Sequence, residues 1–230
     1  MNENTLGDVS PETLSATRQS LHSIAEHVLA VQLYQSIGKI GLRRTAGGFG
    51  QPEHLVGAER RRLRVDGVHL VVTTGDHEEW HPLTTVRNAC DVVGIEPGQQ
   101  TGVFAPSTSL DVDRVLPFDR GAATALADWS QLAELALEEF RRGSRARNPT
   151  IVQWWPEHFD QSFSMSEINF GASNGDDAHD QPYWYVGPWQ PTPGAFWNRP
   201  WGALRSWTEI YSVSDAVSFF EEGLAAVSSG

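Results

Sequence analysis

The sequence predicts an α+β fold in which largely antiparallel sheets pack against two long helices, with a further helix near the C-terminus. Two stretches with apolar residues at helical spacing are each followed by several short β-prone segments. Because these segments follow one another with short turns between them, we expect antiparallel pairing. We expect one domain over residues 1–230, with disordered ends at about residues 1–9 and 226–230.

Residues that start and stop helices mark the helical stretches. Ser10 and Pro11 are a typical helix start, and Gly38 a typical stop, so the first helix is expected from about Pro11 to about Tyr34. Asp119 is suited to cap a second long helix that ends near residue 141, and a last helix starts near residues 212–214. A short helix is expected over residues 86–93, with Cys90 buried on its apolar side.

The strands are predicted from β-prone runs between turn residues. The clearest hairpin joins residues 62–65 to 68–72, with Asp66 and Gly67 as its two-residue turn. Residues 47–52 and 95–117 are expected to be loops. The remaining strands are expected at residues 39–44, 78–83, 150–155, 159–165, 168–172 and 183–186.

Composition and charge exclude several classes of function. The formal net charge of −12 disfavours nucleic-acid binding, because a polyanion is repelled. A single cysteine permits neither an internal disulfide nor a zinc–thiolate cluster. The polar, acidic N-terminus is no signal peptide, and no segment is long and apolar enough for a membrane, so we expect a cytoplasmic protein.

Acids, imidazoles and aromatic rings gather between Trp154 and Trp189, which predicts a small-molecule site there. If residues 154–160 are extended, His158 and Asp160 share one face and Glu157 lies on the other. A carboxylate beside an imidazole suits a general base or a metal ligand. These three residues are therefore the catalytic candidates.

A second cluster, at residues 175–180, is a loop by composition. Asp176 and His179 could join His158 in binding a divalent metal ion, although no strong metal motif is present. The alternative is that the aspartates of this loop cap turns by bonding to their own backbone.

Aromatic residues dominate the same stretch, and seven of the nine tryptophans lie between Trp154 and Trp207. Indole faces can bind sugars and other amphipathic ligands, or they can simply fill a core. Trp155, Trp184 and Trp189 are expected as walls of the site. Its ligand-binding residues are expected to be Trp155, Asn169, Asp176, His179, Tyr183, Tyr185 and Trp189.

Several runs of the chain resemble those of an uncharacterised actinobacterial protein family. They are residues 37–42 (IGKIGL), 47–50 (GGFG), 155–160 (WPEHFD), 168–171 (INFG) and 175–189, which follow the pattern GDxxHxxPYxYVGPW. The chain is also similar to a more distant group of bacterial proteins. The resemblance covers nearly the whole chain, implies a single domain and singles out the central stretch, but it implies no reaction.

Three hypotheses of function follow. The first is a soluble protein that binds a small polar ligand in an aromatic, acidic pocket on residues 154–189. The second is a metal-assisted hydrolase in which His158, His179 and Asp176 hold the metal and Glu157 or Asp160 activates water. The third is an interaction protein, most simply a homodimer, that uses the Trp-rich tail at residues 188–207.

Overall fold

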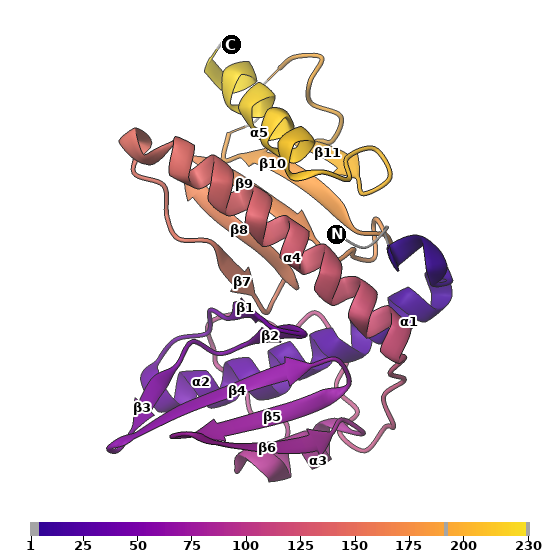
Figure 1. Ribbon diagram of the computed structural model, residues 1–230, viewed down its shortest axis with the longest axis vertical. Coiled ribbons are helices and arrows are strands. Elements are labelled where there is room, and N and C mark those ends of the chain that lie inside the picture. Colours follow the sequence, from indigo (N-terminus) through magenta and orange to yellow (C-terminus); the bar gives the residue numbers. More distant parts are fainter. Residues whose placement is uncertain (1–4, 191–192, 229–230) are drawn as a thin grey trace. The chain divides into compact units, whose positions relative to one another are not determined.

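A computed structural model describes residues 5–190 and 193–228 of the chain (Figure 1). The described residues form helices and two antiparallel sheets, which confirms the predicted α+β class. By its internal contacts the chain divides into two units, one of residues 1–128 with 154–159 and the other of residues 129–153 with 160–230. The single domain expected from the sequence stays a prediction.

A long helical stretch opens the first unit and has a π-helical turn at its centre. Ser10 caps α1 (Pro11–Ile24) by accepting a backbone hydrogen bond through its hydroxyl. The helix widens over Ala25–Leu29, continues as α2 (Ala30–Ile37) and ends at Gly38, which has a φ of 69°. The predicted start and stop are both confirmed.

The first sheet is a meander that follows this helix. Its order is β1-β2-β4-β5-β6, with β3 paired to β4, and all of these pairs are antiparallel. The short strands β2 and β3 were not expected, because runs of three residues carry no readable alternation. The strands are β1 (Arg43–Thr45), β2 (Gly48–Gly50), β3 (His54–Val56), β4 (Glu59–Asp66), β5 (His69–Thr74) and β6 (His77–Pro82).

The predicted hairpin forms, but its turn is displaced by one residue. Asp66 is paired with His69, so the loop is Gly67–Val68 and not Asp66–Gly67. Gly67 has a φ of 57°, and a two-residue hairpin loop with glycine first is a common solution to the twist of the strands. Asp66 therefore ends β4 as a paired strand residue.

The first unit continues with α3 (Val86–Val93), which Thr85 caps and Gly94 ends in a left-handed conformation. Cys90 is fully buried in it, as predicted. The irregular excursion expected over residues 95–117 is present and leads to α4 (Arg120–Gly143), whose residues from Trp129 onward belong to the second unit.

The second unit repeats the plan of a helix followed by a meander. Its sheet has the order β11-β10-β9-β8-β7 and antiparallel neighbours along β8 to β11. Strand β11 was not predicted. The elements are β8 (Asp160–Met165), β9 (Ile168–Ser173), β10 (Tyr183–Pro188), β11 (Ala203–Ser206) and α5 (Val213–Ser228); β7 (Gln153–Trp155) has Gln153 in the second unit and Trp154 and Trp155 in the first.

Parts of the expected disordered ends, residues 1–4 and 229–230, lie outside the described residues. Next to them, Thr5–Asp8 is a 3-10 helix and α5 runs to Ser228.

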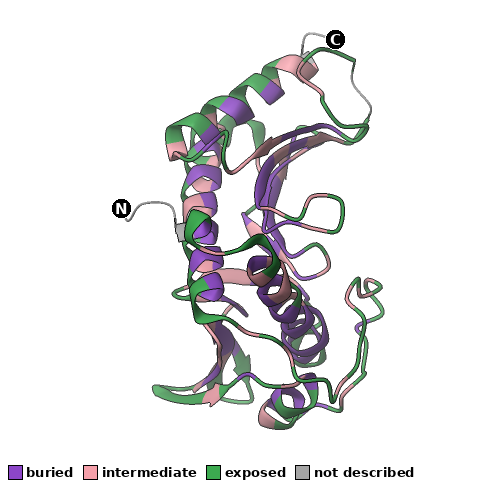
Figure 2. Ribbon diagram, turned by 90° about the vertical axis from the view of Figure 1, so that its right-hand side faces the viewer, coloured by how far each residue is buried: buried purple, intermediate pink, exposed green. Residues whose placement is uncertain are grey.

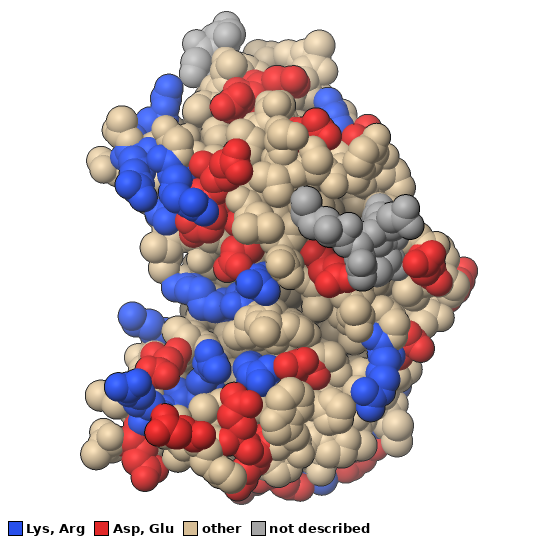
Figure 3. Space-filling view, in the orientation of Figure 1, with Lys and Arg blue, Asp and Glu red and all other residues tan. Residues whose placement is uncertain are grey.

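On the face shown in Figure 3, Lys and Arg side chains gather over the C-terminal end of α4 with acidic side chains beside them, and Glu138 there pairs with Arg141. No helix within the described residues has the length and apolarity to cross a membrane.

Candidate functional site

The sheet of the second unit has two unlike faces, because successive residues of a strand point to opposite sides. One face packs against α4 and α5, which lie together on one side of the sheet (Figures 1 and 2). Phe163 and Phe170 contact Phe140 of α4, and Trp184 contacts Phe220 of α5. Trp184 is fully buried here, so the expectation that it lines the ligand site is wrong.

The opposite face, which we call the polar face, carries hydroxyls, amides and a carboxylate. Several of its side chains are buried: Asp160 is 5% exposed and Tyr183 is 7% exposed. By strand register the face consists of Asp160, Ser162 and Ser164 of β8, Asn169, Gly171 and Ser173 of β9, and Tyr183, Tyr185 and Gly187 of β10.

Tyr185 and Asp160 form the first tyrosine–carboxylate pair of this face. The Tyr185 hydroxyl donates a hydrogen bond to Asp160 Oδ2. Its ring lies directly on Gly171, where a Cβ atom would come within 2.3 Å of Tyr185 Cζ. Burial, followed by the negative charge of Asp160, raises the pKa of Tyr185 well above its usual range. The hydroxyl therefore keeps its proton at neutral pH.

Tyr183 and Asp176 form the second pair. The Tyr183 hydroxyl donates to Asp176 Oδ2 at 2.6 Å, and burial, followed by this bond, raises the pKa of Tyr183. Asp176 Oδ1 accepts from the backbone N–H groups of Ala178 and His179, at 2.7 and 2.8 Å. Asp176 thus holds the turn that precedes β10, which was the alternative to metal binding, and also orients a tyrosine.

A row of aromatic rings follows β10 along the polar face. The His179 ring lies edge-on to Tyr183 at 5.3 Å, Tyr183 lies 6.2 Å from Tyr185, and Tyr185 lies 6.1 Å from Trp201. Trp189 joins them through a hydrogen bond from its indole N–H to Asn169 Oδ1 at 3.1 Å. Hydroxyls, carboxylates and rings are thus combined on one surface of one unit.

The sequence-predicted residues divide between the two units. The second unit brings most of them together on or beside the polar face, namely Asp160, Asn169, Asp176, His179, Tyr183, Tyr185 and Trp189. Three others, Trp155, Glu157 and His158, belong to the first unit.

The expectation that residues 154–160 are extended is wrong. After β7 the chain makes a turn over residues 156–159, and Phe159 has a φ of 51°. Proline cannot donate to a strand ladder, which favours a break at Pro156. His158 is exposed in this turn, whereas Asp160 starts the next strand and bonds to Tyr185, so the two do not alternate along one strand.

Metal binding gains no support from this geometry. Among residues 5–190 and 193–228, no three His, Cys, Asp or Glu side chains are placed to hold a metal ion. The proposed ligands His158, His179 and Asp176 come from different units, and Asp176 is already engaged by a tyrosine and two backbone amides.

The Trp-rich tail is only partly exposed. Trp201 is 46% exposed, whereas Trp197 and Trp207 are half-buried, and residues 191 and 192 lie outside the described part of the chain. The homodimer hypothesis therefore stays a prediction.

A polar cluster in the first unit was missed as a site feature. Glu26 is buried in the π-helical segment, and its carboxylate accepts hydrogen bonds from the backbone N–H groups of Ser107 and Thr108, at 2.7 and 2.9 Å. Both hydroxyls donate to it as well, and His22 Nε2 lies 3.4 Å away. Burial raises the pKa of Glu26, but the hydrogen bond and charge of His22, followed by the loop bonds, outweigh it and lower the pKa to about 2.

This cluster fastens a loop and does not form a catalytic triad. In a triad, opposite ring nitrogens of the histidine face the nucleophile and the acid. Here His22 Nε2 alone faces Glu26 and Ser107, at 3.4 and 3.5 Å, and it also bonds to the carbonyl oxygen of Pro156 at 2.8 Å. The helical spacing of His22 and Glu26 was the only signal in the sequence, because the loop partners lie about 81 residues further on.

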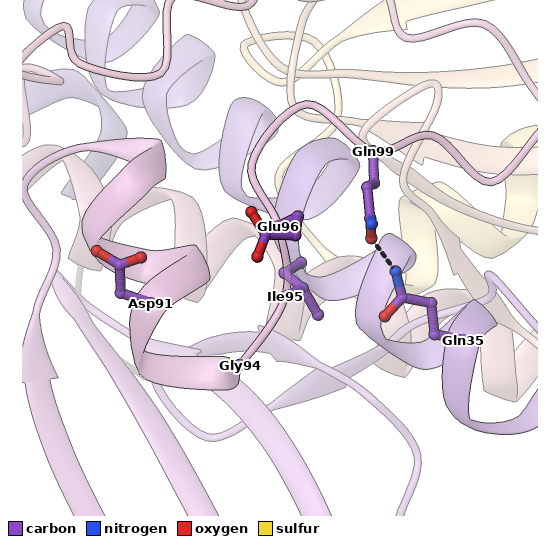
Figure 4. A pocket seen from close by; sticks show the side chains of 6 residues that line it. All are labelled: Gln35, Asp91, Gly94, Ile95, Glu96 and Gln99. Carbon is purple, nitrogen blue, oxygen red and sulfur yellow. Dashed lines mark hydrogen bonds between the residues drawn. The ribbon is translucent and has the colours of Figure 1, made fainter.

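The first unit also has an open pocket of about 580 Å³ (Figure 4). It lies where the C-terminal ends of α2 and α3 meet residues 95–99. Gln35 and Gln99 point toward each other and are hydrogen-bonded, while the carboxylates of Asp91 and Glu96 lie apart. None of the sequence-predicted site residues lines it.

Comparison of the chain with protein-family models, with curated proteins and with solved structures gives no match. The resemblance to the actinobacterial family is not tested by these comparisons and stays a prediction.

Proposed function

We propose that the protein binds a small polar ligand on the polar face of its second sheet. The observation that carries this proposal is the pair of tyrosine–carboxylate bonds, Tyr185 with Asp160 and Tyr183 with Asp176, side by side on the face opposite α4 and α5. Ligand sites commonly combine aromatic walls with a few fixed polar groups that set orientation. The aromatic row along β10 supplies those walls.

The cost of this arrangement supports a function for it. Burying a carboxylate or a hydroxyl is unfavourable unless each is hydrogen-bonded, and a sheet face that serves only stability can carry exposed polar side chains. A glycine inside a strand also weakens the strand. Gly171 is nevertheless placed where it admits the Tyr185 ring, so the face orients this hydroxyl at some expense to local stability.

His179 adds a polar atom that suits a ligand contact. Its Nε2 is shielded from solvent, and no hydrogen-bond partner lies within reach of it among the described residues. Buried polar atoms in proteins are nearly always satisfied by a group of the protein, by water or by a ligand. Its ring packs against Tyr183, so this nitrogen belongs to the same face.

Binding is favoured over general-base catalysis by the two tyrosines. The raised pKa values keep both tyrosine hydroxyls protonated at neutral pH, so they act as hydrogen-bond donors and acceptors and not as bases. The motif over residues 175–189 supplies Asp176, Tyr183 and Tyr185, so we also propose that proteins sharing this motif share the binding face.

The test compares the wild type with Tyr185→Phe in a thermal-shift and tryptophan-fluorescence screen of sugars, amines and amino acids. Tyr211→Phe, at a position that is 67% exposed, is the matched control. Loss of one ligand hydrogen bond is worth about 1.4 kcal/mol, so we expect roughly tenfold weaker binding in Tyr185→Phe alone. Equal affinity of both variants for a ligand of the wild type would contradict the proposal, as would an absence of binding across the screen.

A further inference from the structure

Two exposed indoles flank a glycine at one end of the polar face. Trp189 is 58% exposed and Trp201 is 46% exposed, both unusually high for such large apolar side chains. A Cβ atom on Gly187 would lie 3.7 Å from the carbonyl oxygen of Trp201 and 4.0 Å from its ring. On the other side, Gly187 pairs with Asn169, to which the Trp189 indole is hydrogen-bonded. The two rings thus lie on either side of Gly187, and we call the surface formed by Gly187, Asn169, Trp189 and Trp201 the slot.

The side chains under this slot are polar and neutral. Asn169 Oδ1 accepts hydrogen bonds from both the Ser164 hydroxyl, at 2.7 Å, and the Trp189 indole, at 3.1 Å. Because these bonds occupy the amide oxygen, the orientation of the amide is fixed and its nitrogen is the group that can donate to a ligand. Trp189 is held by its own backbone as well, since its N–H donates to the carbonyl oxygen of Glu167.

We propose that this slot binds a pyranose ring of a carbohydrate. A pyranose has an apolar C–H face that can lie on an indole, and its hydroxyls both donate and accept, which matches the Asn169 amide and the Ser164 hydroxyl. An organic cation can also lie on an indole face, but a cationic group cannot accept the hydrogen bond that the Asn169 amide nitrogen offers. The neighbouring polar-face positions, Ser164, Asn169, Gly171 and Gly187, are all uncharged, and the acids of this face lie toward the other end of β10. Glu167, in the hairpin beyond β8, borders the slot, since its carbonyl oxygen accepts from the Trp189 N–H, and the titration of amines tests whether a cation binds there instead.

The inference rests on the proposed function, because the slot continues the polar face from Tyr185 through its ring contact with Trp201. It adds a ligand class and two residues that select it. The aromatic row then has two roles: the hydroxyls of Tyr183 and Tyr185 orient the ligand, and the exposed indoles supply the stacking surface.

The experiment titrates the full chain with methyl glucopyranoside, methyl galactopyranoside, N-acetylglucosamine and their short oligosaccharides, followed by tryptophan fluorescence and by saturation transfer to the sugar protons. The variants are Trp189→Ala, Trp201→Ala and Asn169→Ala, with Tyr211→Ala as the control for loss of an exposed aromatic. Circular dichroism checks that each variant is folded. We expect at least one sugar to bind, and each of the three slot variants to weaken its binding roughly tenfold or more, which is about 1.4 kcal/mol.

Choline, arginine and spermidine are titrated in parallel, with Tyr185→Phe added to the variants. If these amines bind, sugars do not, and Tyr185→Phe weakens the amines, the carbohydrate inference is overturned and the proposed function stands. Sugar binding that Tyr185→Phe weakens but the indole variants leave unchanged also overturns the slot alone. If no compound binds the wild type, both proposals fail.

Discussion

Replacing Glu26 by glutamine tests whether its buried carboxylate stabilises the first unit. The pKa of Glu26 is lowered from the usual 4.5 to about 2, and its side chain is fully buried, so the charged form is favoured by about 3 kcal/mol in the folded protein. A pKa that is depressed on folding contributes stability above the unfolded value of 4.5. That contribution is lost as the pH falls toward 2, and about 2 kcal/mol of it is gone by pH 3.

Urea unfolding of the wild type and Glu26→Gln at pH 7 and pH 3 measures this contribution. At pH 7 we expect the variant to be less stable by about 3 kcal/mol, because an amide replaces an oxygen that accepts from the loop. At pH 3 the difference should shrink to about 1 kcal/mol, since the wild type has lost most of the same term. Glu221→Gln, at an exposed position of α5, is the control and should follow the wild type at both pH values. Parallel stability curves for the wild type and Glu26→Gln would refute the reasoning.

Three further predictions concern groups whose surroundings are equally well defined. Gly171→Ala should lower the free energy of unfolding by about 2–4 kcal/mol in thermal unfolding, because the new Cβ displaces the Tyr185 ring. The control Gly143→Ala, whose Cβ meets no atom within 4 Å, should not destabilise the protein. If a Tyr185→Ala background does not reduce the cost of Gly171→Ala, this prediction is contradicted. The pKa of Tyr185 is raised on folding, so the contribution of its protonated hydroxyl to the stability of the folded state is complete below the unfolded pKa of about 10 and is lost at higher pH. In urea titrations, Tyr185→Phe should therefore lose less stability than the wild type between pH 9 and pH 11. Burial, followed by the charge of Asp91, raises the pKa of Cys90 to about 11. A thiol reagent at pH 8 should therefore modify Cys90 only after the protein unfolds. Rapid modification of the folded protein would contradict this prediction and show that the surroundings of Cys90 open.

Much of the fold could be predicted because its signals are local. Ser10 and Gly38 limit the first helix through their own backbone preferences, and the alternation in residues 62–72 defines a hairpin whatever surrounds it. The observed hairpin loop lies one residue further along the chain than the predicted one, because Gly67 can occupy either of the two loop positions. The strand at Gly48–Gly50 could not be predicted, since glycines there read as a loop, although Gly50 is required by the close approach of Arg64.

The site was predictable to the extent that strand alternation holds. Tyr183 and Tyr185 share a face and Trp184 takes the other because β10 is regular, so the pairing of the two tyrosines follows from the sequence alone. Which face is the core does not follow, and Trp184 was therefore misplaced. The prediction that His158 and Asp160 share one face was wrong because the strand breaks at Pro156. After such a break, strand alternation no longer predicts the side to which the following residues point.

A comparison of the two sheets gives a further argument for the proposed ligand face on the second. A Phe-x-Gln run occurs at one strand of each sheet, residues 49–51 at β2 and residues 159–161 at the start of β8, although Phe159 itself is counted with the first unit. In each run the glutamine amide donates to a carbonyl oxygen of the long helix: Gln51 to Leu29 and Gln161 to Ser130, both at 2.9 Å. The shared bond ties the sheet to the helix and leaves the middle residue on the opposite face. In the first unit that residue is Gly50, whose strand partner Arg64 packs closely over it. In the second it is Asp160, which holds the Tyr185 hydroxyl. One position of the run thus holds glycine beneath Arg64 in the first sheet and, in the second, the aspartate that orients the Tyr185 hydroxyl. We expect Asp160→Gly to abolish the proposed ligand binding while leaving the helix–sheet bond of Gln161 in place.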